Sequence, residues 1–355
     1  MQLVNARDVK NVPGRPKTDK LDAVWLAKLT EKGLLRPSFV PPAPIRVLRD
    51  YTRMRVDLVR DRTRYWSRLE KLLEDALIKV SSVASSLKTA STRDMVEALI
   101  RGQGDPQALA ALARGPMRAK RAALVEALTG RFDAHHGELA RILLDQIDRL
   151  DIEIAKLTGR LGALLDEIDP SPSPHTPPGG GDGDTSMTNT SMINARQRLA
   201  EIPGISTESA QLIIAEIGLD MSRFPTAAHL VSWAKLCPRT IQSGTSHATG
   251  KTGKGNPYLK GALGIAAATS SRTRHTFLSE RYRRLVARRG KGKALVAVAR
   301  SILVIIWHLL ADPTARYHDL GADFYDHRVN TTRKINNLVR QLEALGHTVT
   351  LQPTT

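Results

Sequence analysis

The sequence predicts a mainly α-helical protein with a small residual α/β piece at its N-terminus. Three observations predict this fold class. Apolar and aromatic residues recur every seven positions between residues 45 and 79, and they alternate spacings of four and three between residues 139 and 168. A turn at residues 203–204 separates two further helices with apolar faces. Only residues 3–4 have the character of a strand.

The N-terminal segment, residues 1–44, contains one predicted helix, which Thr18 or Asp19 can cap. The proline-rich run at residues 39–44 predicts a stiff, extended linker after it. Asp19 and Asp22 are three residues apart and therefore share one face of the helix. Two carboxylates so placed can share a divalent metal ion. The alternative is that they only cap the helix and complement its dipole.

A long helix is predicted from Ile45 to about Lys79. Its apolar face repeats at Tyr51, Leu58, Tyr65 and Leu72, and its other faces are rich in arginine interleaved with aspartate. This pattern allows two interpretations, a solvated face of mixed charge or a helix laid along a nucleic-acid backbone. The arginines are Arg46, Arg49, Arg53, Arg55, Arg60, Arg62, Arg64 and Arg68.

A second long helix is predicted between Leu139 and Ile168, where apolar residues form a coiled-coil seam with charged residues outside it. The helix can pair with the 45–79 helix in an intramolecular hairpin or with a second copy of the chain. The sequence leaves both arrangements open. The seam residues are Leu143, Ile147, Leu150, Ile154, Leu157, Leu161, Leu164 and Ile168.

Residues 169–193 are rich in Pro, Gly, Ser and Thr without an apolar pattern, which predicts a disordered linker. The linker separates the helical region, residues 45–168, from a third domain, residues 194–312, and residues 313–355 are expected to form a C-terminal tail. The stretch 194–310 carries 18 Lys and Arg against 5 Asp and Glu, within a chain of net charge +18. This charge predicts a polyanionic partner, with nucleic acid ahead of a membrane surface.

The composition excludes several classes of protein. The single cysteine, Cys237, excludes an intrachain disulfide framework and a multi-cysteine zinc site. With 5 Phe, 4 Trp and 6 Tyr among 355 residues, base stacking is not expected to be the main mode of nucleic-acid contact. The apolar run at residues 302–310 is too short to cross a bilayer, and residues 1–10 lack the apolar block of a signal peptide. We expect a cytoplasmic, nucleoid-associated protein of bacterial type with no membrane partner.

Residues 199–218 predict a helix, a tight turn at Pro203-Gly204 and a second helix, in the manner of a helix-hairpin-helix. Such a hairpin presents backbone N–H groups at the start of its second helix, where a phosphate oxygen can bind. Gly204 is therefore a candidate nucleic-acid-binding residue. The alternative is an ordinary turn between two helices.

A segment rich in glycine and lysine follows. A nucleotide-binding P-loop would require glycine at position 245, where this sequence has Thr245. A mobile basic loop that closes over a nucleic-acid backbone fits the residues better. The candidate contact residues are Arg239, Lys251, Lys254 and Lys260.

Ser243 lies in this segment beside Gly244, which places its hydroxyl on a flexible turn. A serine hydroxyl is a weak nucleophile at neutral pH, and neighbouring cations can stabilise both its alkoxide and a charge-rich transition state at phosphorus. His247 offers a base. From composition alone, the simpler interpretations are that Ser243 is a turn residue and His247 a loop histidine.

The order of these motifs resembles that of the DEDD-type insertion-sequence transposases (the insertion-sequence one-hundred-and-ten family). The C-terminal carboxylate motif of the family is similar to Lys17-Thr-Asp-Lys-Leu-Asp-Ala followed by Trp25-Leu-Ala. Its second catalytic domain is similar to Ile202-Pro-Gly-Ile-Ser, Gln242-Ser-Gly, Lys254-Gly-Asn-Pro-Tyr-Leu-Lys and Tyr282-Arg-Arg-Leu-Val-Ala-Arg-Arg-Gly. The resemblance covers most of the chain outside the linker and residues 81–137.

The resemblance implies an incomplete RuvC-like nuclease domain at residues 1–44, a coiled-coil middle and a C-terminal domain with a nucleophilic serine. Ser243 matches that serine. Asp19 and Asp22 match two of the family's carboxylates and would bind Mg²⁺ near it, in the same or a neighbouring subunit. Arg283 and Arg284 match a basic motif and are expected to contact nucleic acid. The resemblance also implies cleavage of DNA through a 5′-phosphoserine linkage, a structured guide RNA and a homo-oligomer, dimer or tetramer.

The chain departs from the family pattern in three places. The family's first Asp and its Glu would both precede Leu3, so we expect an N-terminally truncated transposase that is inactive alone. Pro16 stands next to the carboxylate motif, and Lys235 stands where the family usually has glycine.

The competing interpretation is a non-catalytic, basic nucleic-acid-binding protein that assembles through the coiled coil. It explains the charge and the hairpin, and the absent carboxylates favour it. The DNA upstream of the Met1 codon distinguishes the two interpretations. If it encodes, in frame, an Asp-bearing strand and then a Glu-bearing strand, the enzyme is favoured. If it contains stop codons, a decayed gene is favoured.

Overall fold

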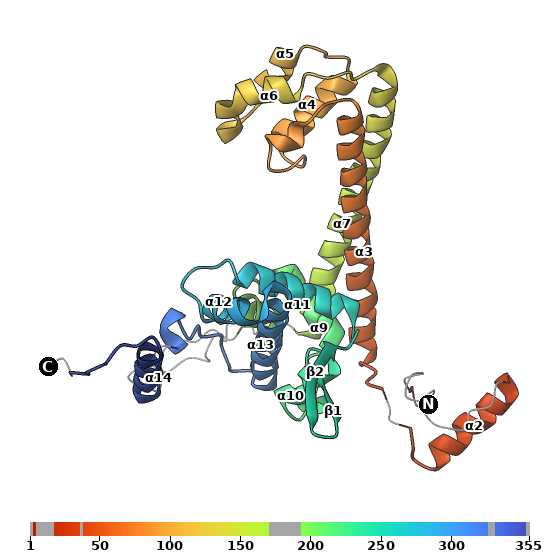
Figure 1. The fold of residues 1–355 in the computed structure, drawn as a ribbon. Helices are drawn as coiled ribbons and strands as arrows, with labels where there is room; N and C mark the ends of the chain where they lie inside the picture. The colour runs from red at the N-terminus through yellow and green to blue at the C-terminus, as the bar shows by residue number, and fades with distance from the viewer. Residues whose placement is uncertain (1–2, 5–17, 36–37, 170–192, 326–330, 353–355) are drawn as a thin grey trace, which may run out of the picture.

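The structure is a computed structural model that describes residues 3–4, 18–35, 38–169, 193–325 and 331–352. For residues 239–241, 243, 246–249, 331 and 333–334 it describes the backbone alone. Figure 1 shows a long two-helix stalk with a small helical tip at one end and a larger helical domain at the other. The described residues are mainly helical and contain one two-stranded sheet, so the predicted mainly α fold class is confirmed. The RuvC-like N-terminal domain stays a prediction.

The N-terminal helix α2 (Asp19–Glu31) begins where the sequence predicts it. Thr18 is its N-cap, and the Thr18 hydroxyl accepts a hydrogen bond from the Leu21 N–H (3.4 Å). Asp19 and Asp22 lie in the first turn, where carboxylates complement the positive end of the helix dipole. Figure 1 shows α2 standing apart from the stalk and from the C-terminal domain.

The stiff, extended linker predicted at residues 39–44 ends at Pro42, and residues 38–42 lie outside helices and strands. Helix α3 (Ala43–Asp75) starts inside this run, with Pro44 in its first turn, where the fixed φ of proline suits a helix. Phe39 packs edge-on against Phe224 and Trp233, with 5.7 and 5.9 Å between ring centroids. Phe39 therefore anchors this segment to the C-terminal domain.

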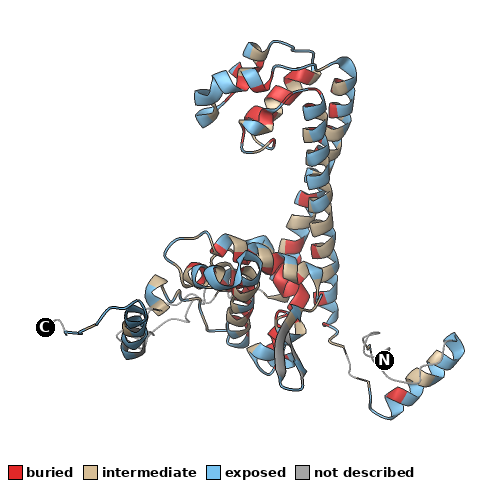
Figure 2. Ribbon diagram, in the orientation of Figure 1, coloured by how far each residue is buried: buried red, intermediate tan, exposed pale blue. Residues whose placement is uncertain are grey.

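The stalk consists of α3 and α7 (Ala134–Ile168), which pack against each other. The intramolecular hairpin is thus the arrangement that the single chain adopts, and pairing with a second copy stays a prediction. Helix α3 ends before Lys79, because the chain reverses at Leu77, which has a left-handed conformation (φ 63°). Figure 2 shows that the middle of the stalk is mostly half-buried or exposed.

The tip is a small helical subdomain within the predicted helical region, residues 45–168, and its individual elements were not predicted. Its Leu109 and Leu124 are fully buried in one apolar cluster with Leu69 of α3 and Leu144 of α7. The tip and that end of the stalk therefore share a core. The elements of the tip are η1 (Val80–Ser82), α4 (Ala90–Ile100), α5 (Pro106–Ala111), η2 (Gly115–Lys120) and α6 (Arg121–Ala127).

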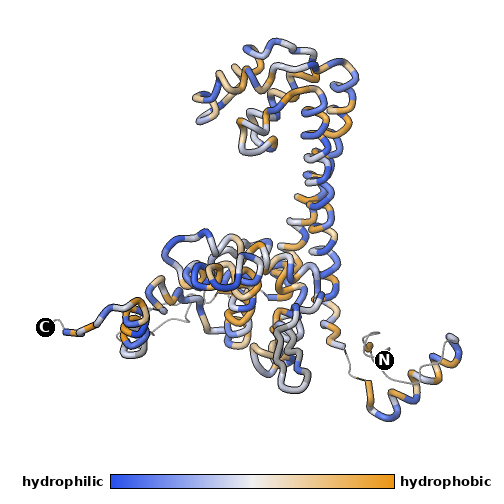
Figure 3. The backbone as a smooth tube through the Cα atoms, viewed as in Figure 1, coloured by the Kyte–Doolittle hydropathy of each residue, from blue (hydrophilic) through white to orange (hydrophobic). Residues whose placement is uncertain are grey.

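The C-terminal domain is built around one apolar helix, α13 (Lys291–Ala311). The other helices are α8 (Ala195–Ala200), α9 (Thr207–Ile217), η3 (Met221–Arg223), α10 (Ala227–Trp233), α11 (Pro257–Ser270) and α12 (Phe277–Arg289). By length and composition α13 could cross a membrane, but it packs against α10, α11 and α12 and buries Val298, Ile302 and Ile306. We interpret it as the core helix of this domain. Figure 3 contrasts the hydrophilic stalk with the apolar segments here.

The glycine- and lysine-rich segment, predicted as a mobile basic loop, forms a β-hairpin. Strand β1 (Pro238–Ser243) pairs antiparallel with β2 (Ser246–Thr252), with one irregularity in register near Pro238. The strands are joined through Gly244 (φ 58°) and Thr245, a two-residue connection typical of tight hairpins. The strands were hard to predict, because their side chains are mostly polar and show no apolar alternation.

The predicted C-terminal tail contains two elements, η4 (Ala322–Tyr325) and the helix α14 (Thr331–Ala344). The Tyr325 ring stacks on Phe277 (5.6 Å between centroids), which attaches η4 to α12. Helix α14 stands apart in Figure 1 and exposes leucine side chains. Residues 170–192 of the predicted linker lie outside the described residues.

Candidate nucleic-acid interface and catalytic site

The segment that follows the hairpin is held in one shape by its own side chains. Asn256 is the N-cap of α11, and its side-chain oxygen accepts hydrogen bonds from the N–H groups of Tyr258 (2.9 Å) and Leu259 (3.3 Å). Pro257 occupies the first turn. Gly255 has φ 60°, and a Cβ there would lie 2.7 Å from the Ala234 carbonyl oxygen. Only glycine fits that position without strain.

A fully buried carboxylate, Glu216 of α9, connects this segment to the stalk. Arg53 of α3 donates to both of its oxygens, from Nε (2.8 Å) and Nη2 (2.9 Å), and the Asn256 amide donates to Oε2. Arg49 donates to the backbone carbonyls of Ala215 (3.0 Å) and Glu216 (2.7 Å). The hydrogen bond to Glu216 raises the pKa of Arg53. The network fixes α3, α9 and the start of α11 as one unit.

Tyr258 adds a second contact between α11 and the stalk. Its hydroxyl donates to Asp57 (2.9 Å), and this hydrogen bond raises the pKa of the hydroxyl. The guanidinium groups of Arg53 and Arg60 lie over its ring, 5.0 and 5.1 Å from the centroid. Several α3 arginines are thus used to attach the C-terminal domain, a role that neither sequence interpretation of this helix included.

Lys260, a predicted nucleic-acid contact, is engaged within the protein. Its ammonium group donates to the carbonyl oxygens of Gly253 (2.7 Å) and Lys235 (3.3 Å), and burial lowers its pKa. Lys235 has a left-handed backbone (φ 56°), which glycine adopts at lower cost. Its side chain lies against Gly253 and Gly255. These contacts fasten the base of the hairpin to α11.

The hairpin itself presents the other candidates. Ser243 ends β1 opposite Ser246, directly before the turn, and the backbone alone is described at Ser243 and Arg239. Lys251 in β2 and Lys254 after it are exposed. The hairpin, which projects from the domain (Figure 1), thus carries Ser243 at its turn and Arg239 and Lys251 toward its base, with Lys254 just after β2.

The predicted metal ligands lie elsewhere in the chain. Asp19 is exposed and lies with Asp22 in the first turn of α2, and Figure 1 shows α2 and the β1–β2 hairpin on separate parts of the molecule. Within the described ranges, a cluster of three metal-ligating side chains occurs at Asp133, His135 and His136 and does not include these aspartates. Two carboxylates still suit Mg²⁺, which commonly completes its coordination with water and substrate phosphates.

Gly204 lies in a turn packed against α11. It has φ 90°, and a Cβ there would lie 2.4 Å from the Ala266 carbonyl oxygen. The Ser270 hydroxyl donates to the Pro203 carbonyl oxygen (2.7 Å). Close packing thus accounts for this glycine, and contact of the turn with phosphate stays a prediction.

The predicted arginines of α12 both have partners in the chain. Arg283 forms an ion pair with Glu280, and the Arg284 guanidinium lies 4.7 Å from the centroid of the Tyr325 ring. More exposed cations follow at the α12–α13 junction, and the Arg-Arg-Gly-Lys-Gly-Lys run was the sequence signal that could have identified them. These residues are Arg288, Arg289, Lys291 and Lys293.

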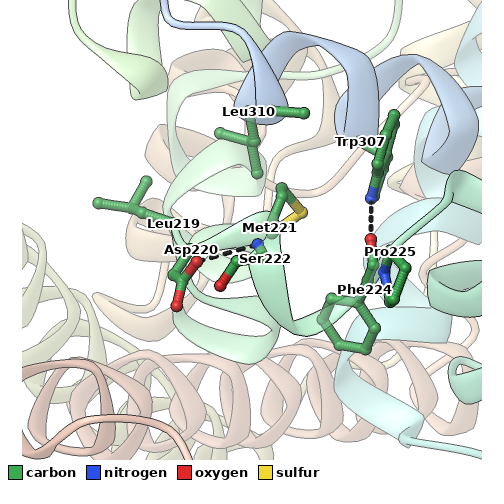
Figure 4. A pocket seen from close by; sticks show the side chains of 9 residues that line it. Leu219, Asp220, Met221, Ser222, Phe224, Pro225, Trp307 and Leu310 are labelled. Carbon is green, nitrogen blue, oxygen red and sulfur yellow. Dashed lines mark hydrogen bonds between the residues drawn. The ribbon is translucent and has the colours of Figure 1, made fainter.

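A hollow of about 500 Å³ between η3 and α13 lies outside the candidate site (Figure 4). The Trp307 indole N–H donates to the Phe224 carbonyl oxygen (2.9 Å), and Asp220 accepts from the Ser222 N–H (2.9 Å). None of the predicted site residues lines it.

Comparison with known proteins finds two protein families that match separate parts of the chain. Residues 196–283 match the family described as "Transposase IS116/IS110/IS902 family", and residues 1–78 match the DEDD transposase family of IS110 elements. The chain belongs to the IS110 family of transposases. The first match includes the β1–β2 hairpin and the start of α11, and the second includes α2 and α3.

Curated relatives of this IS110-family chain align with about a third of its residues. An "Insertion element IS110 uncharacterized 43.6 kDa protein" of Streptomyces coelicolor is 34% identical over 119 residues, 33% of this chain and 29% of that protein. A "Pilin gene-inverting protein" of Moraxella bovis is 34% identical over 116 residues, 32% of this chain and 35% of that protein, and one of Moraxella lacunata matches equally. The alignments span about a third of the length of these curated relatives.

Proposed function

We propose that this chain acts as a DNA transposase or site-specific recombinase of a mobile insertion sequence and that it cuts and rejoins DNA through Ser243. Membership of the IS110 family supports an enzyme that acts on DNA. The basic C-terminal domain provides the charge that a phosphate backbone requires. The relatives named for inverting a pilin gene support recombination, since inversion requires DNA to be cut and rejoined.

The observation that carries this proposal is the hairpin with Ser243 beside its turn. Its base is fixed by the Glu216 network and by Lys260, so the ribbon leaves the domain in a defined direction. Exposed Lys251 and Lys254 lie toward the base of the hairpin and can bind DNA phosphates some distance from the scissile bond.

In the proposed reaction, the Ser243 hydroxyl oxygen attacks a DNA phosphorus. An Oγ–P bond forms as the P–O3′ bond breaks, which leaves a 5′-phosphoserine linkage and a free 3′-hydroxyl. The serine proton passes to His247 or to water. Attack by the 3′-hydroxyl of a second strand then restores the serine and joins the strands, and each ester formed replaces an ester broken.

Asp19 and Asp22 are the proposed Mg²⁺ ligands. A bound Mg²⁺ would supply positive charge to the scissile phosphate. Because α2 and the hairpin are separate in one chain, we place α2 of one copy beside the hairpin of another, in a homodimer or homotetramer. The resemblance to the family further suggests a structured guide RNA that selects the DNA, in the bacterial cytoplasm.

The test is a suicide DNA substrate, cut from the ends of the element and nicked so that cleavage traps the covalent complex. We expect a version of the chain that carries all four of the family's carboxylates to form a protein–DNA adduct. Ser243→Ala in that version should form none, while its DNA affinity changes less than about twofold, since phosphate contacts carry most of the affinity. Ser246→Ala, across the turn, is the matched control and should retain the adduct. An adduct with Ser243→Ala would refute the proposal.

A non-catalytic, basic nucleic-acid-binding protein is the second candidate function. The separation of Asp19 and Asp22 from Ser243 in the single chain favours it. It predicts that the wild-type chain binds the same DNA with strong salt dependence and forms no adduct at any Mg²⁺ concentration.

A further inference from the structure

The tip of the stalk carries a basic surface that the proposed chemistry does not use. Lys88, Arg118, Lys120 and Arg121 are all exposed. The Lys120 ammonium donates to the Val83 carbonyl oxygen (3.0 Å), which brings the η2–α6 junction to the loop that precedes α4. The four cations therefore belong to one region of the tip.

Two carboxylates of the tip, those of Asp94 and Glu97 in α4, are committed elsewhere, whereas Glu126 of α6 is exposed and forms no ion pair among the described residues. Glu97 pairs with Arg93 and Arg141, Arg93 also pairs with Asp148 of α7, and Asp94 pairs with Arg114. These ion pairs attach α4 to the stalk and to η2. Among the described residues, no carboxylate forms an ion pair with Arg118, Lys120 or Arg121, so their charge is available to a partner.

A hollow next to this surface has the chemistry of a phosphate contact. It measures about 300 Å³ and lies between α3 and the loop before α4. Glu70 is its one carboxylate, and its other polar groups are a lysine and hydroxyls, the side chains that usually contact DNA phosphates. These groups belong to Thr63, Ser67, Ser81, Ser85, Ser86 and Lys88.

We propose that the tip is a second DNA-binding surface, which contacts the backbone of duplex DNA beyond the segment held by the C-terminal domain. The 33 residues of α3 extend over roughly 50 Å, or about 15 base pairs of duplex. Figure 1 shows the tip and the C-terminal domain at opposite ends of the stalk and on the same side of it. One duplex can therefore contact both, and the inference rests on the proposed function for the identity of that duplex.

The experiment compares two triple variants of the full chain on two lengths of DNA. R118A/K120A/R121A removes the tip charge, and R149A/K156A/R160A removes the same charge from the exposed surface of α7. Affinity is measured as a function of salt on duplexes of about 8 and about 40 base pairs, the shorter one only about half as long as α3 and therefore too short to reach the tip from the C-terminal domain.

We expect the tip variant to bind the long duplex at least about tenfold more weakly than the wild type. The slope of log affinity against log salt concentration should be shallower by roughly 2 to 3, and the affinity for the short duplex should be unchanged. The affinity of the α7 variant for both duplexes should stay within about twofold of the wild-type affinity. Equal losses in the two variants, or no loss in the tip variant, would overturn the proposal. If the tip variant bound an RNA duplex more weakly but bound DNA as well as the wild type does, the choice of DNA as the partner of the tip would be overturned.

Two further variants distinguish a loss of folding, a failure of the tip proposal and a failure of the proposed function. R118Q/R121Q keeps the Lys120–Val83 hydrogen bond, and it replaces the triple variant if circular dichroism shows that the triple variant has lost helix. It should make the salt slope shallower by roughly 2. K251A/K254A should lower the affinity for the short duplex if the C-terminal domain binds DNA as proposed. No effect there would count against the proposed function, while the length dependence would still test the tip.

Discussion

Arg53 of the stalk forms a two-point ion pair with Glu216 of the C-terminal domain, with Nε–Oε1 and Nη2–Oε2 distances of 2.8 and 2.9 Å. The residues are 163 positions apart, and Glu216 is fully buried. Asn256, which caps α11, donates to the same carboxylate. One buried charge therefore orients the stalk, α9 and the segment that follows the hairpin.

Replacing Glu216 by Gln should destabilise the chain by about 3 kcal/mol, because it leaves Arg53 and Arg49 beside a neutral group in a buried setting. Urea denaturation followed by circular dichroism measures the change. The control is Asp166→Asn, which breaks an exposed ion pair with Arg196 and should cost less than about 1 kcal/mol. Similar losses in the two variants would show that the Glu216 network contributes little.

Gly255→Ala and Gly244→Ala separate backbone strain from close packing. Both glycines have φ near 60°, but a Cβ at Gly255 meets the Ala234 carbonyl at 2.7 Å, whereas one at Gly244 meets no atom within 4 Å. We expect a loss of about 1 kcal/mol for Gly244→Ala and about 2 to 4 kcal/mol for Gly255→Ala. The account fails if thermal unfolding ranks the two variants in the opposite order.

Lys235→Gly should be more stable than Lys235→Ala by about 1 kcal/mol, because both remove the side chain but only glycine relieves the left-handed backbone. At an ordinary position alanine is the more stable of the two. Chemical denaturation of both variants checks the ranking, and greater stability of the alanine variant would contradict the conformation found at Lys235.

The attachment of the tip to the stalk should weaken in acid. Burial raises the pKa of Glu97, but hydrogen bonds from Arg141 and Arg93 outweigh it and hold the pKa below its ordinary value of 4.5. The ion pairs therefore contribute fully above pH 4.5, and their contribution is lost as the pH falls through the lowered pKa. The free energy of unfolding should differ between wild type and Glu97→Gln at pH 7 and converge in strong acid. A constant difference would rule out titration of Glu97 as the cause.

The long helices were predictable because their periodicity is local. The seam from Leu143 to Ile168 and the heptad of Tyr51 to Leu72 appear in the sequence itself, and the Thr18 cap follows a known rule. The hairpin was not predictable in the same way, since its polar strands pair with each other and cover no core. The tip has short helices without a sustained repeat, so its fold depends on contacts with the stalk.

The connections within the site depend on contacts between distant residues. A single carboxylate at Glu216, inside the apolar run Leu-Ile-Ile-Ala-Glu-Ile, was the signal that a buried partner must exist. No feature of the sequence near Glu216 identifies Arg53 as that partner. The glycine expected by family resemblance at Lys235 was a better guide, because the backbone there has the conformation that glycine prefers.

The most direct test of the central claim is to locate the covalent bond to DNA. The trapped complex is digested with nuclease and protease, and the peptides are sequenced by mass spectrometry. Our account predicts a nucleotide 5′-phosphate attached to the hydroxyl oxygen of Ser243. A nucleotide attached to any other residue, or DNA rejoined with no protein-linked nucleotide, would contradict it.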